Sequence, residues 1–262
     1  MKSLLFVPVF NCEKQISRLI HSLEDRKIGE EFDVIFVDNQ SSDSSVAVVR
    51  ELLEKSSKLG FARLYQNDWN LGLGGSHKVA IEISILEGYE YLVVLHGDDQ
   101  ANPKDIEVGL NLIKLSSMDC VLGARFMKGS HLEGYSRIRI IGNRIFNLLF
   151  TIRFFFPVSD MGSGLNVYRT CFLKKIRFEN HPDDLTFNNS LLTWSLLIKS
   201  KIAFFPISWS EKDQISNARI ARQSVAILRI LSKSRGAFSS IKKDSEPYVI
   251  RTKLIFSTKE DS

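Results

Sequence analysis

The sequence has few cysteines and no long apolar run, and both absences narrow the class of protein. Its 262 residues include three cysteines, Cys12, Cys120 and Cys171, which lie far apart and form no C-x-x-C pair. An odd number at this spacing predicts reduced thiols in a cytoplasmic protein, and it favours neither a disulfide framework nor a structural zinc site. No stretch approaches the ~18 apolar residues of a membrane-spanning helix. A proline and an asparagine interrupt the apolar N-terminus, which argues against a signal peptide.

The remaining composition is that of a globular domain with a small excess of positive charge. Hydrophobic residues make up 44% and charged residues 25% of the chain, and the formal net charge is +5. This charge favours contact with phosphates or with an anionic membrane surface, and no nucleic-acid-binding motif accompanies it. The length predicts one α/β domain.

Apolar runs and helical stretches alternate through the first hundred residues. The runs LLFVPVF, FDVIFVD and YLVVL are continuous, which is typical of strands covered on both faces, and weaker strands are predicted at FARLYQN and DCVLGARF. Helical stretches begin at Glu13 and near Ser44. Strands joined by crossover helices predict an α/β fold of the three-layer αβα type, with a mostly parallel central sheet, in a single domain.

Polar residues and glycines follow four of the predicted strands, at the edge where parallel sheets bind ligands. In chain order these are Pro8, Phe10, Asn11 and Glu13; Asp38, Asn39 and Asp43; Asn70, Gly72 and Gly74; and His96, Gly97, Asp98 and Gln100. Single groups have plain structural alternatives, since Asp38 could cap a turn and the glycines could form a tight bend. The glycine loop also lacks the spacing of the Walker and dinucleotide motifs.

The order and spacing of these groups resemble the nucleotide-sugar half of family-2 glycosyltransferases, which have the Rossmann-like GT-A fold, and in particular the branch of dolichyl- and polyprenyl-phosphate mannosyl- and glucosyltransferases. The resemblance covers roughly residues 3 to 235. It implies transfer of a sugar from a UDP- or GDP-sugar to a polyprenyl-phosphate or glycan acceptor in cell-surface polysaccharide or glycolipid synthesis. It also implies donor binding by the residues after the first three strands and by Gly97.

The carboxylates after the fourth strand gain a role from this resemblance. Asp98 stands where the family's metal-binding aspartate stands, and Gln100 at a position that helps to hold the metal. Mg²⁺ or Mn²⁺ is therefore the expected cofactor, because hard cations prefer oxygen ligands. His96 replaces the first aspartate of the usual D-x-D motif, which predicts weaker metal binding. Asp99 lies between the two proposed ligands and is expected to point elsewhere.

The resemblance continues into the second half of the chain. Arg125 in GARF, Arg139 in RIIGNRIFN and Lys212 in SEKD are expected to contact donor phosphates, since an arginine can grip phosphate oxygens with two hydrogen bonds. Asn143 and Asn147 share the helix face of Arg139. Asp160 in VSDMGSGLNVYR is expected beside the acceptor, as a catalytic residue together with Asp98, and its alternative is a helix cap. Asn166 replaces a common arginine, which puts the lipid-phosphate acceptor in question.

Several interpretations stay open at this point. One alternative is a transferase acting on a soluble sugar hydroxyl, and another is a catalytically silent nucleotide-sugar-binding protein of the same fold. The segment 137–156, RIRIIGNRIFNLLFTIRFFF, is amphipathic and either packs on the sheet or lies at a membrane interface. A membrane surface or membrane protein is thus an expected partner, at the inner face of the cell membrane. Residues 1–235 are predicted to form the domain and 236–262 a weakly structured tail.

Overall fold

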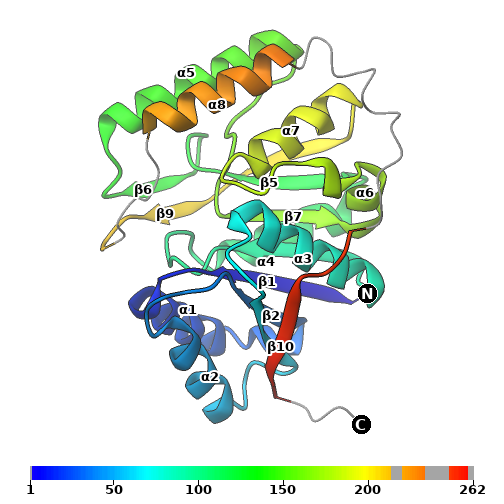
Figure 1. Cartoon of the computed structure of the whole chain (residues 1–262). Helices are drawn as coiled ribbons and strands as arrows, with labels where there is room; N and C mark the ends of the chain where they lie inside the picture. The colour runs from blue at the N-terminus through cyan, green and yellow to red at the C-terminus, as the bar shows by residue number, and fades with distance from the viewer. Residues whose placement is uncertain (1, 214–219, 234–247, 259–262) are drawn as a thin grey trace.

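A central eight-stranded sheet organises the molecule (Figure 1). The computed structural model describes residues 2–213, 220–233 and 248–258. The strand order is β10-β3-β2-β1-β4-β7-β5-β8. The strands of this sheet are β1 (Ser3–Val9), β2 (Phe32–Asp38), β3 (Ala62–Asn67), β4 (Tyr91–Leu95), β5 (Cys120–Ala124), β7 (Leu165–Arg169), β8 (Ile202–Pro206) and β10 (Thr252–Ser257).

All of these strands except β7 and β10 run in the same direction. β1 pairs in parallel with β2 and β4, β2 with β3, and β5 with β8. β7 is inserted antiparallel between β4 and β5, and β10 pairs antiparallel with β3. The mostly parallel sheet confirms the predicted fold class. β10 differs from the prediction, because it forms a strand, with a shift in register between Leu254 and Phe256, within the segment 236–262 that was expected to be weakly structured.

Helices cover both faces of the sheet and complete the three layers (Figure 1). One hydrophobic cluster contains residues of α1 (Glu13–Asp25), α2 (Ser45–Lys55) and α4 (Asp105–Leu115). The other contains residues of α3 (Gly72–Leu86), α6 (Thr170–Lys175) and α7 (Phe187–Leu197). Two short 3₁₀ helices, η1 (Ile28–Glu30) and η2 (Phe178–Asn180), lie in the connections.

The local sequence explains the layers. α1 buries Ile16, Leu19, Ile20 and Leu23, whose spacing places them on one helix face. β4 is buried along its whole length, as its continuous run YLVVL predicts for a strand covered on both sides. Full burial of one such aliphatic side chain is worth ~1.5–3 kcal/mol, so the core positions hold the strand ends in register.

A second, two-stranded sheet lies beside the main one. It pairs β6 (His131–Glu133) in parallel with β9 (Ser208–Ser210), and a bridge from Trp209 to Ala101 ties it to the loop after β4. The long helix α5 (Arg137–Phe154) and α8 (Ile220–Lys233) lie at one end of the molecule, at the top of Figure 1. Among the described residues, none of the helices combines the length and apolar character needed to cross a bilayer.

Candidate active site

The carboxyl ends of β1, β2 and β4 are neighbours, and this brings three predicted groups to one edge of the sheet. Val9 is opposite Asp38 in the register of β1 and β2. Gly97, which follows β4, donates its backbone N–H to the Pro8 carbonyl at 3.1 Å. A Cβ atom on Gly97 would lie 2.7 Å from that carbonyl oxygen, so the close approach requires glycine. Pro8 and Gly97 therefore position the two loops against each other.

Asp38 is buried at the end of β2, and its carboxylate organises the loop that follows. It accepts hydrogen bonds from the backbone N–H groups of Gln40 and Ser41 at 3.1 and 3.2 Å. Gln66 of β3 adds a side-chain hydrogen bond at 3.1 Å. These contacts hold the carboxylate at the mouth of the sheet, which agrees in part with the turn-capping alternative.

An asparagine cluster lies next to Asp38. The Asn39 side chain donates to Asn70 Oδ1 at 2.8 Å and accepts from Asn67 Nδ2 at 2.9 Å and from the Leu71 backbone at 2.8 Å. The predicted residues Asn39 and Asn70 thus come together. Asn67 was not predicted, and its position at the end of β3 was the available signal.

Asn11, Glu13 and Asp43 join the β1–α1 loop to the β2–α2 loop. Asn11 has a left-handed backbone, with φ 49°, and its Oδ1 accepts from the Ser42 backbone at 2.7 Å. Glu13 accepts from the Ser44 backbone at 3.1 Å and donates its own N–H to Asp43 at 3.2 Å. These three predicted donor-binding side chains therefore serve the loop structure, whereas the neighbouring Phe10 ring is exposed.

Asp98 is partly buried in the loop after β4. Its Oδ1 accepts from the Gln100 backbone at 3.2 Å. Burial raises the pKa of this carboxyl to about 6, and the neighbouring Asp99 acts in the same direction. Asp99 itself has a left-handed backbone, with φ 57°, and is held by Arg18 of α1 at 2.8 Å. The two adjacent aspartates thus have different partners.

His96 lies two residues before Asp98 and is partly buried. Its backbone N–H donates to the Gly164 carbonyl at 2.9 Å, and a Cβ atom on Gly164 would lie 3.0 Å from the imidazole ring. The ring centroid lies 5.8 Å from that of His77. Burial lowers the pKa of His96 to about 4, so the imidazole is neutral near pH 7. His96 therefore cannot replace the charge of an aspartate.

Arg125 and Asp160 form a buried ion pair. Arg125 donates Nε to Asp160 Oδ2 at 2.8 Å and Nη2 to Oδ1 at 2.9 Å, and its backbone N–H also reaches Oδ2 at 2.9 Å. The guanidinium carbon lies 4.9 Å from the Trp209 ring and 5.1 Å from the Phe126 ring. The two residues that were expected to have separate roles, as a phosphate contact and an acceptor-side base, thus contact each other in this structure.

Glu211 connects the loop after β4 to α5, a role that the sequence analysis missed. Its Oε2 accepts from Arg139 at 2.7 Å, and its Oε1 accepts from the Gln100 side chain at 3.4 Å. The predicted site residues Arg139 and Gln100 are thus joined by a carboxylate that lies between them. The adjacent Lys212 is exposed. Asn143 and Asn147 share the helix face of Arg139, and their side chains bond the Arg139 and Ser159 carbonyls.

The glycines after β3 pack closely against another part of the chain, the segment around Pro182 and Asp183. A Cβ atom on Gly72 would lie 2.4 Å from the Asp183 carbonyl oxygen, and one on Gly74 would lie 2.3 Å from that of Pro182. Gly72 also has a φ of 74°. Close backbone approach explains these glycines. The buried Lys78 pairs with the same loop, at 2.7 Å from Asp183.

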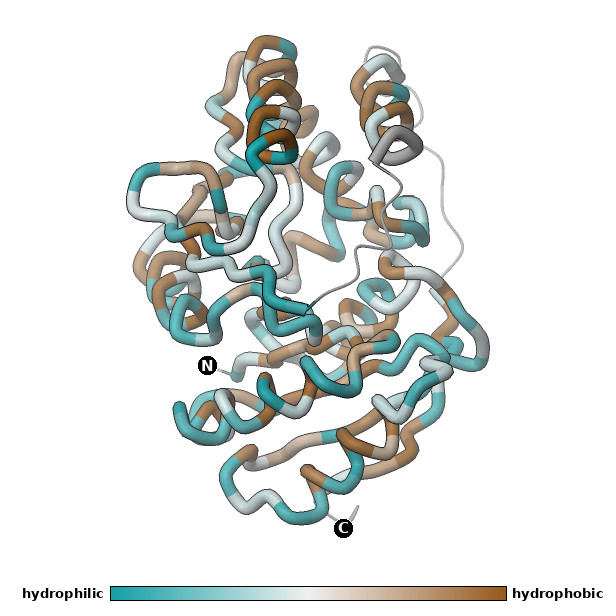
Figure 2. The backbone as a smooth tube through the Cα atoms, turned by 90° about the vertical axis from the view of Figure 1, so that its left-hand side faces the viewer, coloured by the Kyte–Doolittle hydropathy of each residue, from teal (hydrophilic) through white to brown (hydrophobic). Residues whose placement is uncertain are grey.

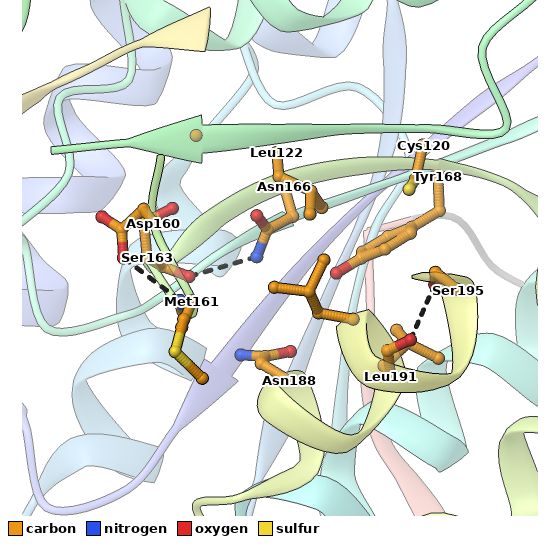
Figure 3. A pocket seen from close by; sticks show the side chains of 13 residues that line it. Cys120, Leu122, Asp160, Met161, Ser163, Asn166, Tyr168, Asn188, Leu191 and Ser195 are labelled. Atoms are coloured by element: carbon orange, nitrogen blue, oxygen red, sulfur yellow. Dashed lines mark hydrogen bonds between the residues drawn. The ribbon is translucent and has the colours of Figure 1, made fainter. Parts of the chain in front are cut away.

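A small pocket adjoins Asp160 between β5, β7 and α7 (Figure 3). Leu122, Asn166 and Tyr168 line its strand side, and Asn188, Leu191 and Ser195 line its helix side. Asn166 donates its side-chain N–H to the Ser163 carbonyl at 3.1 Å. Where arginine is common in the family that the sequence resembles, this chain thus has a buried neutral amide.

Known proteins share this sequence pattern and fold. The profile of Glycosyl transferase family 2 matches residues 5–177, more than half of the 262-residue chain. An uncharacterised protein of Methanocaldococcus jannaschii is 27% identical over 177 residues, which is 66% of this chain and 73% of that protein. S. aureus TarS 1–349 in complex with UDP-GlcNAc is 21% identical with a TM-score of 0.62, covering 89% of this chain and 66% of that chain.

A third similarity extends over almost the whole chain. The mannosyltransferase PcManGT of Pyrobaculum calidifontis, in complex with GDP-Man and Mn²⁺, is 16% identical with a TM-score of 0.57. The match covers 94% of this chain and 66% of that chain. At these identities the structures show a shared fold, and the profile match shows the family. The chain therefore belongs to glycosyl transferase family 2.

Proposed function

We propose that the protein is a metal-dependent hexosyltransferase that uses a UDP- or GDP-sugar and a polyprenyl-phosphate or glycan acceptor, in the synthesis of cell-surface polysaccharide or glycolipid. The observation that carries the proposal is the position of Asp98 and Gln100 at the carboxyl end of β4, one strand from the end of β1 and two from Asp38. Parallel sheets bind nucleotides at this edge.

The donor is proposed to lie across the ends of β1 and β2. Asp38 and Asn11 would flank the base and ribose, and the exposed Phe10 ring offers an apolar face on which a base can stack. TarS was solved with UDP-GlcNAc and PcManGT with GDP-Man, which supports a nucleotide-sugar donor and leaves both bases as candidates.

The residues present fit a hard divalent cation that shares its ligands with the donor. Asp98 and Gln100 would hold it through a carboxylate and an amide oxygen, the ligand types that Mg²⁺ and Mn²⁺ prefer. Within residues 2–213, 220–233 and 248–258 no cluster of three or more His, Cys, Asp or Glu side chains could form a complete protein cage. A cation held by one or two protein ligands takes the rest from phosphates and water, and it would neutralise the departing diphosphate.

The chain's own cations are proposed to orient the phosphates. Glu211 bridges Arg139 and Gln100 by hydrogen bonds, and the exposed Lys212 is the residue after Glu211. A bidentate arginine would hold the diphosphate oxygens in place, and it would exchange its bond to Glu211 for the more highly charged phosphate. Arg125 would act differently from our expectation, by fixing the Asp160 loop.

The Arg125–Asp160 pair also bears on the acceptor. A sugar hydroxyl needs a base to remove its proton, whereas a phosphate is already ionised and mainly needs positioning. Both oxygens of Asp160, the predicted base, accept hydrogen bonds from Arg125. This favours a phosphate acceptor over the soluble sugar hydroxyl. A lipid-linked phosphate would place the protein at the inner face of the cell membrane.

A thermal-shift panel of UDP- and GDP-sugars, with and without Mn²⁺, tests the donor and the cation together, because a ligand that binds the native state raises Tm. Donor hydrolysis measured under the same conditions separates an enzyme from a silent binding protein, which would show the shift without turnover. Asp98→Ala should remove the Mn²⁺-dependent activity. More than about a tenth of wild-type turnover, a barrier change below ~1.4 kcal/mol, would contradict the metal role.

A further inference from the structure

The outer face of α5 carries a continuous row of exposed apolar side chains, which we call the α5 stripe. Its members are Ile138, Ile141, Ile145, Leu148, Ile152 and Phe155, with exposed fractions of 82, 60, 53, 57, 60 and 95%. The five members within α5 recur at spacings of three and four residues, which places them on one side of the helix, and Phe155 follows directly after the helix ends. The stripe is therefore a surface feature, and it excludes the interpretation that these residues are core.

The opposite face of the same helix belongs to the protein interior and to the candidate site. Asn147 and Phe150 are buried, and Arg139 bonds Glu211 next to the loop after β4. Only the thickness of one helix, about 10–12 Å with side chains, separates the two faces. Whatever covers the stripe therefore lies close to the residues proposed to hold phosphates.

The charge of this end of the molecule indicates what covers it. α5 contains four arginines and no acidic residue, and Arg137 and Arg144 are exposed. α8, at the same end in Figures 1 and 2, also has no acidic residue and exposes Val225 and Leu228. A second copy packed along the stripe would bring arginines against arginines, whereas an anionic bilayer neutralises them.

We propose that the α5 stripe inserts into the interface of an anionic membrane, with the exposed Arg137 and Arg144 at the level of the lipid phosphates. Apolar side chains on one face and arginines beside them are what an interfacial helix requires. The role of this membrane contact rests on the proposed function, because an inserted α5 stripe would bring a lipid-linked phosphate within about one helix diameter of Arg139.

Vesicle co-sedimentation of the full chain tests the surface. The wild type should sediment with phosphatidylcholine vesicles that contain about one third phosphatidylglycerol at low salt, and should release when salt is raised or when phosphatidylglycerol is left out. Ile145→Glu should lower the bound fraction at least about tenfold, because a carboxylate would enter the apolar layer and the anionic surface. Arg144→Glu should also weaken binding.

Matched controls separate the stripe from a general loss of apolar surface or charge. Val108 of α4 is 49% exposed, close to the 53% of Ile145, so Val108→Glu should bind like the wild type, as should Lys114→Glu on the same helix. Circular dichroism should show equal folding of all variants.

Three outcomes would overturn the proposal: a wild type that stays in the supernatant with anionic vesicles, a Val108→Glu loss equal to that of Ile145→Glu, or a solution dimer that Ile145→Glu dissociates. The last result would assign the stripe to a second copy. Donor hydrolysis without vesicles distinguishes this failure from that of the proposed function, because hydrolysis should be equal in the wild type and in Ile145→Glu.

Discussion

Replacing Asp98 by asparagine should make the protein more stable while it removes the metal-dependent activity. The folded carboxyl has a pKa of about 6, chiefly because of burial, against an ordinary value of 3.8. At pH 8 the group is ionised in both the folded and unfolded states, so the folded state bears the cost of the buried charge. That difference in pKa, at ~1.4 kcal/mol for each pH unit, is worth about 3 kcal/mol. Asparagine keeps an oxygen that can accept the Gln100 N–H and carries no charge.

The pH dependence follows from the same two pKa values. As the pH falls through about 6, the folded Asp98 takes up a proton and its cost declines, until the free energies of unfolding of wild type and Asp98→Asn differ by less than about 1 kcal/mol near pH 4. Urea unfolding of both proteins at pH 8, 6 and 4 measures this. For a chain of this size, 3 kcal/mol at pH 8 corresponds to a rise in Tm of roughly 6 °C or more.

Asp43→Asn is the matched control for the sign of the effect. Burial acts to raise the pKa of Asp43, but hydrogen bonds from Ser45 and Glu13 outweigh it and the pKa is lowered. Asp43→Asn should therefore lose stability at pH 8. Manganese should raise the Tm of the wild type and leave that of Asp98→Asn unchanged. An Asp98→Asn variant that is less stable than the wild type at pH 8, or whose advantage does not shrink toward pH 4, would refute the raised pKa of Asp98.

Three further predictions follow from the site and its supports. Asp38→Ala should raise the donor Kd more than it lowers turnover, because contacts to the base and ribose are much the same in ground and transition states, and equal affinity by calorimetry would remove Asp38 from the site. Asp160→Asn should cost ~3–5 kcal/mol in urea unfolding, because it leaves Arg125 buried without its counter-ion. A change below about 1 kcal/mol would show that the pair opens in solution. The buried histidines should make the protein acid-labile. Burial lowers the pKa values of His77, His96 and His181 from 6.5 to about 3, 4 and 3. As the pH falls below 6.5, the unfolded state binds protons that the folded state does not, so the free energy of unfolding should fall by at least about 3 kcal/mol between pH 7 and pH 4.5. Urea midpoints that stay constant over this range would contradict the prediction.

The sequence predicted those features that depend on local pattern. Continuous apolar runs mark strands covered on both faces, and the ends of β2 and β4 then place Asp38 and Asp98 at one edge of a parallel sheet. No contact between distant segments has to be known for that prediction, because strand direction and side-chain position follow from chain order.

The features that the sequence did not reveal all depend on contacts between distant segments. Gly72 is explained by the backbone of Asp183, more than a hundred residues later, and a glycine run alone does not distinguish such an approach from a phosphate loop. Arg125 and Asp160 each match a functional motif, yet in the fold they satisfy each other. The role of Glu211 was not predicted, because it arises only where β9 meets the loop after β4.

The antiparallel strand β10 has a consequence for how the chain folds. Its end is fixed to the start of β3 by Thr258, whose Oγ1 accepts from the Ala62 backbone, 196 residues earlier in the sequence. During synthesis β3 therefore emerges with one edge unpaired. β10 can pair with that edge only after most of the remaining chain has been synthesised. Contacts of such long range slow folding, and open strand edges invite pairing with other chains. Aggregation of nascent or truncated chains is thus expected to begin at β3, and shortening the chain before Thr252 should lower the soluble yield even though none of the predicted site residues lies in β10.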